Sequence, residues 1–202
     1  MTTGSIDKDS KYRDTILSAV NADSVHPVNN GIDMQAHHLI SAKGVKDSEI
    51  GSQLKSMGYD INVLRNLVLI PCTLPGACHL GVQLHRGNHT FEDDNVHPRS
   101  YHREVAERIR GLEPEMDKKC SKNKPIQGLL NKESAKILDM VDSFELPLTK
   151  IYTAFKTTGS HKDTGCANTQ RIPDHKMNKN CNSDRNHFAS VPRHEYTLRV
   201  GK

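Results

Sequence analysis

The segment MQAHHLIS, residues 34–41, sets two histidines side by side in a short apolar run. Its length and its apolar residues are typical of a β-strand. Neighbouring side chains on a strand point to opposite faces, so His37 and His38 can serve one site only where the strand bends or ends, or around a metal ion. The alternative is one core and one solvated histidine, because burying two imidazoles without partners is costly.

A second pair of histidines lies in LHRGNH, residues 84–89. His85 and His89 are four residues apart, a spacing that lets two imidazoles converge on one cation in a helix or tight turn. The peptidase motif H-E-x-x-H has the same spacing, but its glutamate is absent, which argues against a metallopeptidase. With His37 these residues would form a three-imidazole site with open positions for water and substrate, and His38 beside it could act as the general base.

Composition and charge limit the class of protein. The 202 residues include 35% hydrophobic residues and no Trp, which predicts one domain with a core of Leu, Ile and Val and much loop. The net charge of +4 and the 12 histidines suit a polyanionic partner. The sequence has no signal-peptide pattern and no apolar run long enough to span a bilayer, so we expect no membrane partner. We expect a soluble protein that is cytosolic when made and is exported, if at all, without a cleavable signal.

The pattern along the chain predicts an α+β fold. Strands are expected over residues 32–40, 66–71 and 195–200, and helices over 12–20, 47–59, 99–113, 125–144 and 146–156. Residues 72–98 are rich in Gly, Pro and His and are expected to form an ordered loop. We expect four regions: a leader with a short helix (1–30), the functional core (31–112), a helical extension (113–157) and a basic, loop-rich tail (158–202).

Four segments in series carry a family resemblance. AHHLIS, LKSMGYDINVLRNLVLIP, LHRGNH and SYHREVAERI follow one another between residues 36 and 109. Together they resemble the AHH subgroup of the HNH/endonuclease VII nucleases, the ββα-metal or His-Me finger superfamily, which is common as toxin modules in bacterial polymorphic toxins. The resemblance covers about residues 31 to 112.

The resemblance implies a fold, an activity and partners. The fold is a ββα-metal core surrounded by helices, with the basic extension at its C-terminal side. The implied activity is metal-dependent hydrolysis of DNA, or of RNA, with little sequence specificity. The cofactor would be one divalent ion, Mg²⁺, Mn²⁺, Ni²⁺ or Zn²⁺. A toxin would also require a cognate immunity protein, and secretion or delivery into a target cell.

Site residues are implied position by position. His37 matches a metal ligand and His38 the general base, and Asn66 matches the asparagine that orients this base. His85 and His89 resemble paired histidine ligands, and Tyr101 and His102 match a Tyr-His pair at the start of a helix. The spacer of residues 90–100 is longer than usual, which leaves open whether His85 with His89, or His89 with His102, completes the site. The residues thus expected to be catalytic are His37, His38, Asn66 and His89.

Arginines near these motifs are candidates for phosphate contacts. Arg86 and Arg99 flank the site, and Arg103 lies on the expected helix 99–113. Tyr101, at the start of this helix, is a further candidate for contact with the substrate. Such contacts would follow a nucleic-acid backbone without reading bases, and DNA is the favoured partner. The alternative is a solvated helix face on which arginines pair with Glu104 and Glu107.

The cysteines and the tail allow several interpretations. Cys72, Cys78, Cys166 and Cys181, alone or with nearby histidines, could hold a structural Zn²⁺, although no CxxC pair is present; free thiols and disulfide bonds are the alternatives. The basic tail could bind nucleic acid or a neutralising partner, or be a disordered extension. The alternative to a nuclease is a non-catalytic, zinc-stabilised nucleic-acid-binding module in which the histidines are structural.

Overall fold

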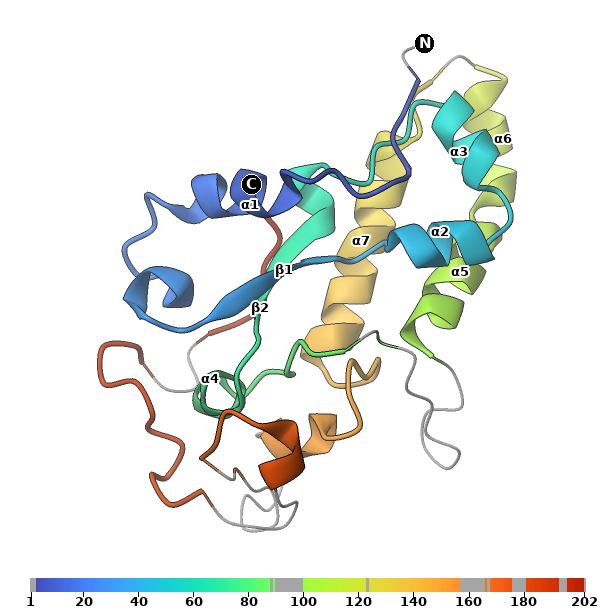
Figure 1. Cartoon of the computed structure of the whole chain (residues 1–202). Coiled ribbons are helices and arrows are strands. Elements are labelled where there is room, and N and C mark those ends of the chain that lie inside the picture. The colour runs from blue at the N-terminus through green and yellow to red at the C-terminus, as the bar shows by residue number, and fades with distance from the viewer. Residues whose placement is uncertain are drawn as a thin grey trace.

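A two-stranded antiparallel sheet lies at the centre of the computed structural model (Figure 1). The structure describes residues 3–87, 89, 100–122, 124–156, 166, 168–175, 181–192 and 196–201. Strand β1 (Met34–His38) pairs with β2 (Leu67–Pro71), with Met34 opposite Pro71 and His38 opposite Leu67. All five residues of β2 are buried, which fits its continuous apolar sequence. The strands predicted over 32–40 and 66–71 are therefore confirmed.

Short helices precede and follow β1 in the chain. Helix α1 (Tyr12–Val20) contacts both strands and is followed by the 3₁₀ helix η1 (Pro27–Asn30). The single helix predicted over 47–59 is wrong: the structure has α2 (Ala42–Asp47) and α3 (Gly51–Ser56), separated at Glu49, which has a positive φ of 65°. The side chain of Ser41 caps α2, so this helix begins directly after β1.

Helix α4 (Leu74–Leu80) follows β2 within the segment predicted to be a loop. The side-chain oxygen of Thr73 accepts a hydrogen bond from Gly76 N, Pro75 occupies the first turn, and Gly81 ends the helix with a φ of 67°. Every residue of α4 is buried. A helix that is buried on all sides has no polar face, so the sequence shows no amphipathic period.

Three longer helices follow in the chain: α5 (Tyr101–Gly111), α6 (Glu113–Cys120) and α7 (Gln127–Asp142). α5 confirms the helix predicted over 99–113 and packs closely on α2. A Cβ atom added at Gly44 would lie 2.5 Å from the Val105 side chain, so only glycine fits at this crossing. α7 confirms the helix predicted over 125–144, and the polar helix α6 was not predicted.

Short elements complete the chain. The helix predicted over 146–156 is reduced to the 3₁₀ helix η3 (Tyr152–Phe155), and η4 (Ile172–Asp174) lies in the tail. Of the strand predicted over 195–200, residue 195 lies outside the described residues; the described part forms a single bridge between Val200 and Val68, extended by a hydrogen bond from Gly201 N to Leu67 O. A main core surrounds the sheet, and a smaller one forms beside α4 and η3. In the part of the chain that is described, no helix is long and apolar enough to cross a membrane.

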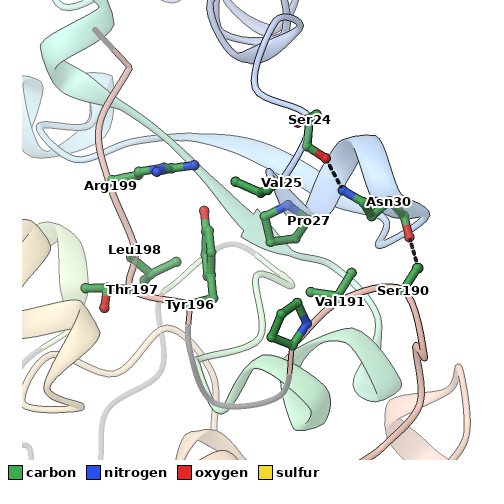
Figure 2. Close-up of a pocket in the computed structure, with 11 residues that line it drawn as sticks. Ser24, Val25, Pro27, Asn30, Ser190, Val191, Tyr196, Thr197, Leu198 and Arg199 are labelled. Carbon is green, nitrogen blue, oxygen red and sulfur yellow. Dashed lines mark hydrogen bonds between the residues drawn. The ribbon is translucent and has the colours of Figure 1, made fainter.

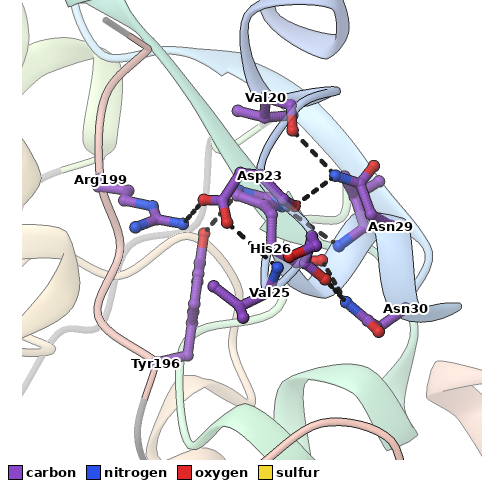
Figure 3. A network of polar contacts seen from close by, with 10 residues as sticks. Val20, Asp23, Val25, His26, Asn29, Asn30, Tyr196 and Arg199 are labelled. Atoms are coloured by element: carbon purple, nitrogen blue, oxygen red, sulfur yellow. Dashed lines mark hydrogen bonds and ion pairs between the residues drawn. The ribbon is translucent and has the colours of Figure 1, made fainter.

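The C-terminal segment also closes a pocket of about 560 Å³ beside η1 (Figure 2). Val25, 74% exposed, is one of its walls. Arg199 forms an ion pair with Asp23, and Tyr196 contacts His26 at 3.3 Å, so these residues tie the segment to the turn after α1 (Figure 3). None of the residues predicted to form the catalytic site lines this pocket.

Candidate active site

Three imidazoles meet beside the sheet. His37 on β1 has its Nδ1 3.0 Å from Nε2 of His85, and this Nε2 lies 3.3 Å from Nε2 of His89. His85 is held at the end of β2 because its backbone N donates to Pro71 O at 2.8 Å. Gly87 and His89 have positive φ values of 79° and 56°, which a right-handed helix does not allow. The two histidines of this segment therefore converge on His37 without a helix.

Hydrogen bonds fix the protonation of His37. The hydroxyl of Tyr101 donates its single proton to Leu39 O at 2.6 Å, so it accepts the bond from His37 Nε2 at 2.9 Å. His37 therefore carries its proton on Nε2. The lone pair on its Nδ1 points at the other two histidines.

The same reasoning applies to the two other rings. His85 Nδ1 lies 3.0 Å from Oε1 of Gln35, and His89 Nδ1 lies 3.2 Å from Leu148 O. Both oxygens only accept, so both Nδ1 atoms are the donors and both Nε2 atoms keep their lone pairs. Gln83 holds Leu148 in place by accepting a hydrogen bond from its backbone N at 2.8 Å.

This arrangement suits a metal ion. Three lone pairs that face one another cannot hydrogen bond together, whereas a cation can accept all three. Nitrogen ligands around a tetrahedral Zn²⁺ are about 3.3 Å apart, close to the separations found here. Each outer ring nitrogen donates to an oxygen, which is how metal-binding histidines are commonly oriented. Burial, and then the neighbouring imidazoles, lower the pKa of His37 well below its usual value and that of His85 to about 3, which keeps these rings neutral.

His38 lies on the other face of β1, as expected for the neighbour of His37. It is only 2% exposed, and its Nε2 is 3.1 Å from Oδ1 of Asn62. The ring of Tyr12 packs against it, with ring centroids 4.5 Å apart. The Asn62 oxygen accepts, so the lone pair of His38 is on Nδ1, which is buried without a hydrogen-bond partner among the described residues. Burial lowers the pKa of His38 to about 4.

Asn66 fixes the end of β1 just after these histidines. Its Oδ1 accepts from Ile40 N at 2.7 Å and from the Ser134 hydroxyl at 2.8 Å, and its Nδ2 donates to Ile40 O and Ile61 O. The side chain is fully buried, so no water competes for these hydrogen bonds. Asn66 therefore holds the segment that follows His38 against η2 (Leu64–Asn66) and α7.

The remaining predicted site residues have different surroundings. His102 Nδ1 lies 2.9 Å from the Ser41 hydroxyl, and its ring centroid is 6.1 Å from that of His89, so it stands outside the three-histidine group. Tyr101 is buried and contacts His37, a position that orients the imidazole and is closed to substrate. Arg86 donates to Gln170 O, and Arg103 is exposed on α5. Arg99 lies outside the described residues.

A surface pocket of about 410 Å³ is lined by one of the three histidines, His85. His85, Gln35, Tyr12 and Arg13 are among its walls. We did not single out the last three residues from the sequence. Gln35 could have been found, because it lies two residues before His37 and so on the same face of the strand. Tyr12 and Arg13 belong to α1, and no sequence signal linked this helix to the site.

The cysteines form a second group, away from the three histidines. Cys78, Cys166 and Cys181 come together with His187, and their possible ligand atoms lie within 4.8 Å of one another. Cys72 stands apart from them and contacts Asp33 O at 3.4 Å. The structure thus assembles three of the four cysteines predicted to share a site, and a histidine is their fourth partner.

Residues 19–138 match a nuclease family of the HNH/ENDO VII superfamily with conserved AHH. The match covers more than half of the chain, and the chain belongs to this AHH family. The protein is therefore a hydrolytic enzyme whose substrate class is nucleic acid, as predicted. No curated protein and no solved structure matches the chain.

Proposed function

We propose that the protein is a metal-dependent endonuclease that hydrolyses phosphodiester bonds of DNA, with His37, His85 and His89 holding one divalent ion. The observation that carries this proposal is the set of three lone pairs directed at one point, each fixed by a donor bond on the far side of its ring. Three protein ligands leave coordination positions for water and phosphate, as catalytic sites require.

His38 is the proposed general base. When bound, a divalent ion stabilises the negative charge that develops on the phosphate and on the leaving oxygen. His38 would take the proton of the attacking water at Nδ1, the nitrogen that carries its lone pair. Because this atom is buried, on the face of β1 opposite His37, the step requires that it become open to the water when substrate binds. The Nε2–H of His38 already donates to Asn62, and this bond stabilises the imidazolium that results. Asn66 would position the strand end that carries both histidines.

Substrate contacts are proposed along the pocket that leads to His85. Arg13 is exposed there and lines the pocket together with Asp33, Gln35 and His85, so a phosphate bound beside His85 would have a cation within the same pocket. Arg86 and Arg103 would extend this contact along the backbone. Phosphate contacts carry no base information, so we expect cleavage with little sequence preference.

The choice of ion is proposed from the chemistry of the ligands, and the biological role from the family resemblance. Three imidazoles favour Zn²⁺ or Ni²⁺ for affinity, whereas Mg²⁺ or Mn²⁺ could act with oxygens supplied by the phosphate. A role as a bacterial toxin, delivered into a target cell and held in check by an acidic immunity protein, rests on the resemblance to toxin modules and on the net charge of +4. The non-catalytic binding module loses support because the family is one of nucleases.

Cleavage of supercoiled plasmid tests this proposal. Wild-type protein is assayed with Mg²⁺, Mn²⁺, Ni²⁺ or Zn²⁺ and with EDTA, beside His38→Ala, His85→Ala and the control His26→Gln, a buried histidine outside the site. We expect nicking that EDTA abolishes. His38→Ala should lose activity and keep the ion at the three histidines, His85→Ala should lose both activity and this ion, and His26→Gln should keep both. Cleavage that survives EDTA, or that survives His85→Ala, contradicts the proposed site, and single-stranded RNA assayed in parallel tests the choice of DNA.

A further inference from the structure

A second cluster of metal-binding side chains joins the tail to the core. We propose that Cys78, Cys166, Cys181 and His187 bind one structural Zn²⁺ ion. Cys78 lies on α4, and the three others come from the C-terminal extension. These three residues also lie beyond residues 19–138, so the AHH family match does not account for them.

The distances fit a tetrahedral zinc site. His187 Nε2 lies 3.2 Å from Cys181 Sγ and 3.7 Å from Cys166 Sγ, and all four ligand atoms are within 4.8 Å of one another. Zinc bonds of about 2.3 Å to sulfur and about 2.0 Å to nitrogen place neighbouring ligand atoms roughly 3.5 to 3.8 Å apart. Small adjustments would therefore bring the four atoms around one ion. A set of three thiolates and one imidazole is a common closed structural site.

Hydrogen bonds around the cluster orient its ligands as a zinc site needs. The backbone N of Asn168 donates to Cys166 Sγ, and that of Arg185 donates to Cys181 Sγ, each at 3.3 Å. Such bonds stabilise a thiolate. His187 Nδ1 lies 3.1 Å from the Ser183 hydroxyl, which leaves Nε2 to face the sulfurs.

Charge balance also favours a divalent ion at this position. Three thiolates and one Zn²⁺ carry a net charge of −1, which is costly to bury without a neighbouring cation. The guanidinium of Arg185, only 6% exposed, donates to Cys78 O and to two carbonyls of η3, from Ala154 and Phe155. The permanent positive charge of Arg185 thus lies beside the backbone of Cys78, one of the proposed ligands.

Such an ion would add to the few apolar contacts of the tail, in which Val191 and Leu198 are buried in the main core. The apolar cluster beside α4 is small, and the tail has only the three-residue η4 as regular structure in its described part. Metal binding can supply the free energy that holds such a segment. His79, next to Cys78, adds to the same junction because its Nδ1 accepts bonds from the backbone N of His187 and of Phe188. Figure 1 shows the tail lying against α4, the helix that leads to His85.

Zinc content and thiol protection test the proposal. The full chain is purified under reducing conditions and its zinc is measured, beside the variants Cys181→Ser and Cys120→Ser. The double variant His37→Ala/His85→Ala removes the proposed catalytic ion. We expect one tightly held zinc ion per chain in the double histidine variant and in its combination with Cys120→Ser, and loss of this ion when Cys181→Ser is added to the double variant instead. Zinc retained in full by Cys181→Ser would overturn the proposal.

Alkylation of the wild-type protein keeps the test decisive if Cys181→Ser fails to fold. We expect iodoacetamide to modify Cys72 and Cys120 at once, and Cys78, Cys166 and Cys181 only after a zinc chelator is added. Cobalt exchanged for zinc should give the intense visible bands of a tetrahedral thiolate site. Protection that does not change with the chelator, or a mass that shows a disulfide bond among the three cysteines, would refute the zinc site.

Discussion

Replacing Tyr101 by phenylalanine removes one hydroxyl group and should weaken metal binding by a predictable amount. In the wild type this hydroxyl accepts the Nε2 proton of His37 and donates to Leu39 O. Without it, His37 can move its proton to Nδ1, where the lone pair of His85 lies 3.0 Å away. The nitrogen that should face the ion is then protonated, and binding must first reverse this change.

The size of the effect follows from measured effects of such outer partners. Their loss commonly reduces metal affinity 10- to 100-fold, equivalent to about 1.4 to 2.7 kcal/mol. The metal-free protein should lose about 1 to 3 kcal/mol of stability, because Leu39 O is left buried without its donor. Titration calorimetry with Zn²⁺ or Ni²⁺ measures the first quantity, and urea unfolding in EDTA measures the second.

Tyr59 provides a matched control. It is fully buried like Tyr101, but its hydroxyl has no hydrogen-bond partner among the described residues. Tyr59→Phe should therefore leave metal affinity unchanged and should not lower stability. If Tyr101→Phe binds the ion as tightly as Tyr59→Phe does, the assignment of protons around His37 is wrong.

Three further predictions concern the strand end, the pocket and the response to acid. Asn66→Ala should lower the free energy of unfolding by about 3 kcal/mol or more, because it leaves several buried backbone groups unpaired; a urea midpoint near that of wild type would contradict this. Arg13→Glu should raise the KM for DNA and flatten its salt dependence, whereas Lys118→Glu on α6 should change neither; equal effects would exclude a phosphate contact at Arg13. Burial, and then Arg199, lower the pKa of His26 below its usual 6.5, so the unfolded chain binds more protons and stability should fall as the pH drops below 6.5. His26→Gln should show a smaller loss between pH 7.5 and 5.5 in denaturant titrations, and an identical loss would contradict the role of His26.

The sequence was most informative where residues near one another in the chain share one site or element. The strand through His37, the strand from Leu67 and the helix from Tyr101 were predicted because each has its own apolar pattern. Helix α4 was missed because complete burial removes the polar face on which helix prediction depends. The break at Glu49 was missed because a positive φ at a residue other than glycine depends on the tertiary fold.

The candidate site was predictable in its residue types and less so in its partners. His37, His85 and His89 were named from their motifs, and the structure brings them together. Gln35, Asn62 and the carbonyl of Leu148, which set the protons, were not, because such contacts have no fixed spacing. Likewise His187, and not Cys72, joins the other cysteines, since sequence spacing alone does not show which loops fold back onto α4.

The bridge between Val68 and Val200 has a consequence for the order in which the protein can be assembled during translation. Strand β2 leaves the ribosome long before its second neighbour has been synthesised, so one edge of the sheet stays open through most of elongation. An open edge can pair with another nascent chain. Synthesis that pauses before residue 200 should therefore favour aggregation. Pulse-labelled chains stalled at residue 190 should be more sensitive to protease than stalled chains in which an added linker brings residue 200 out of the ribosome.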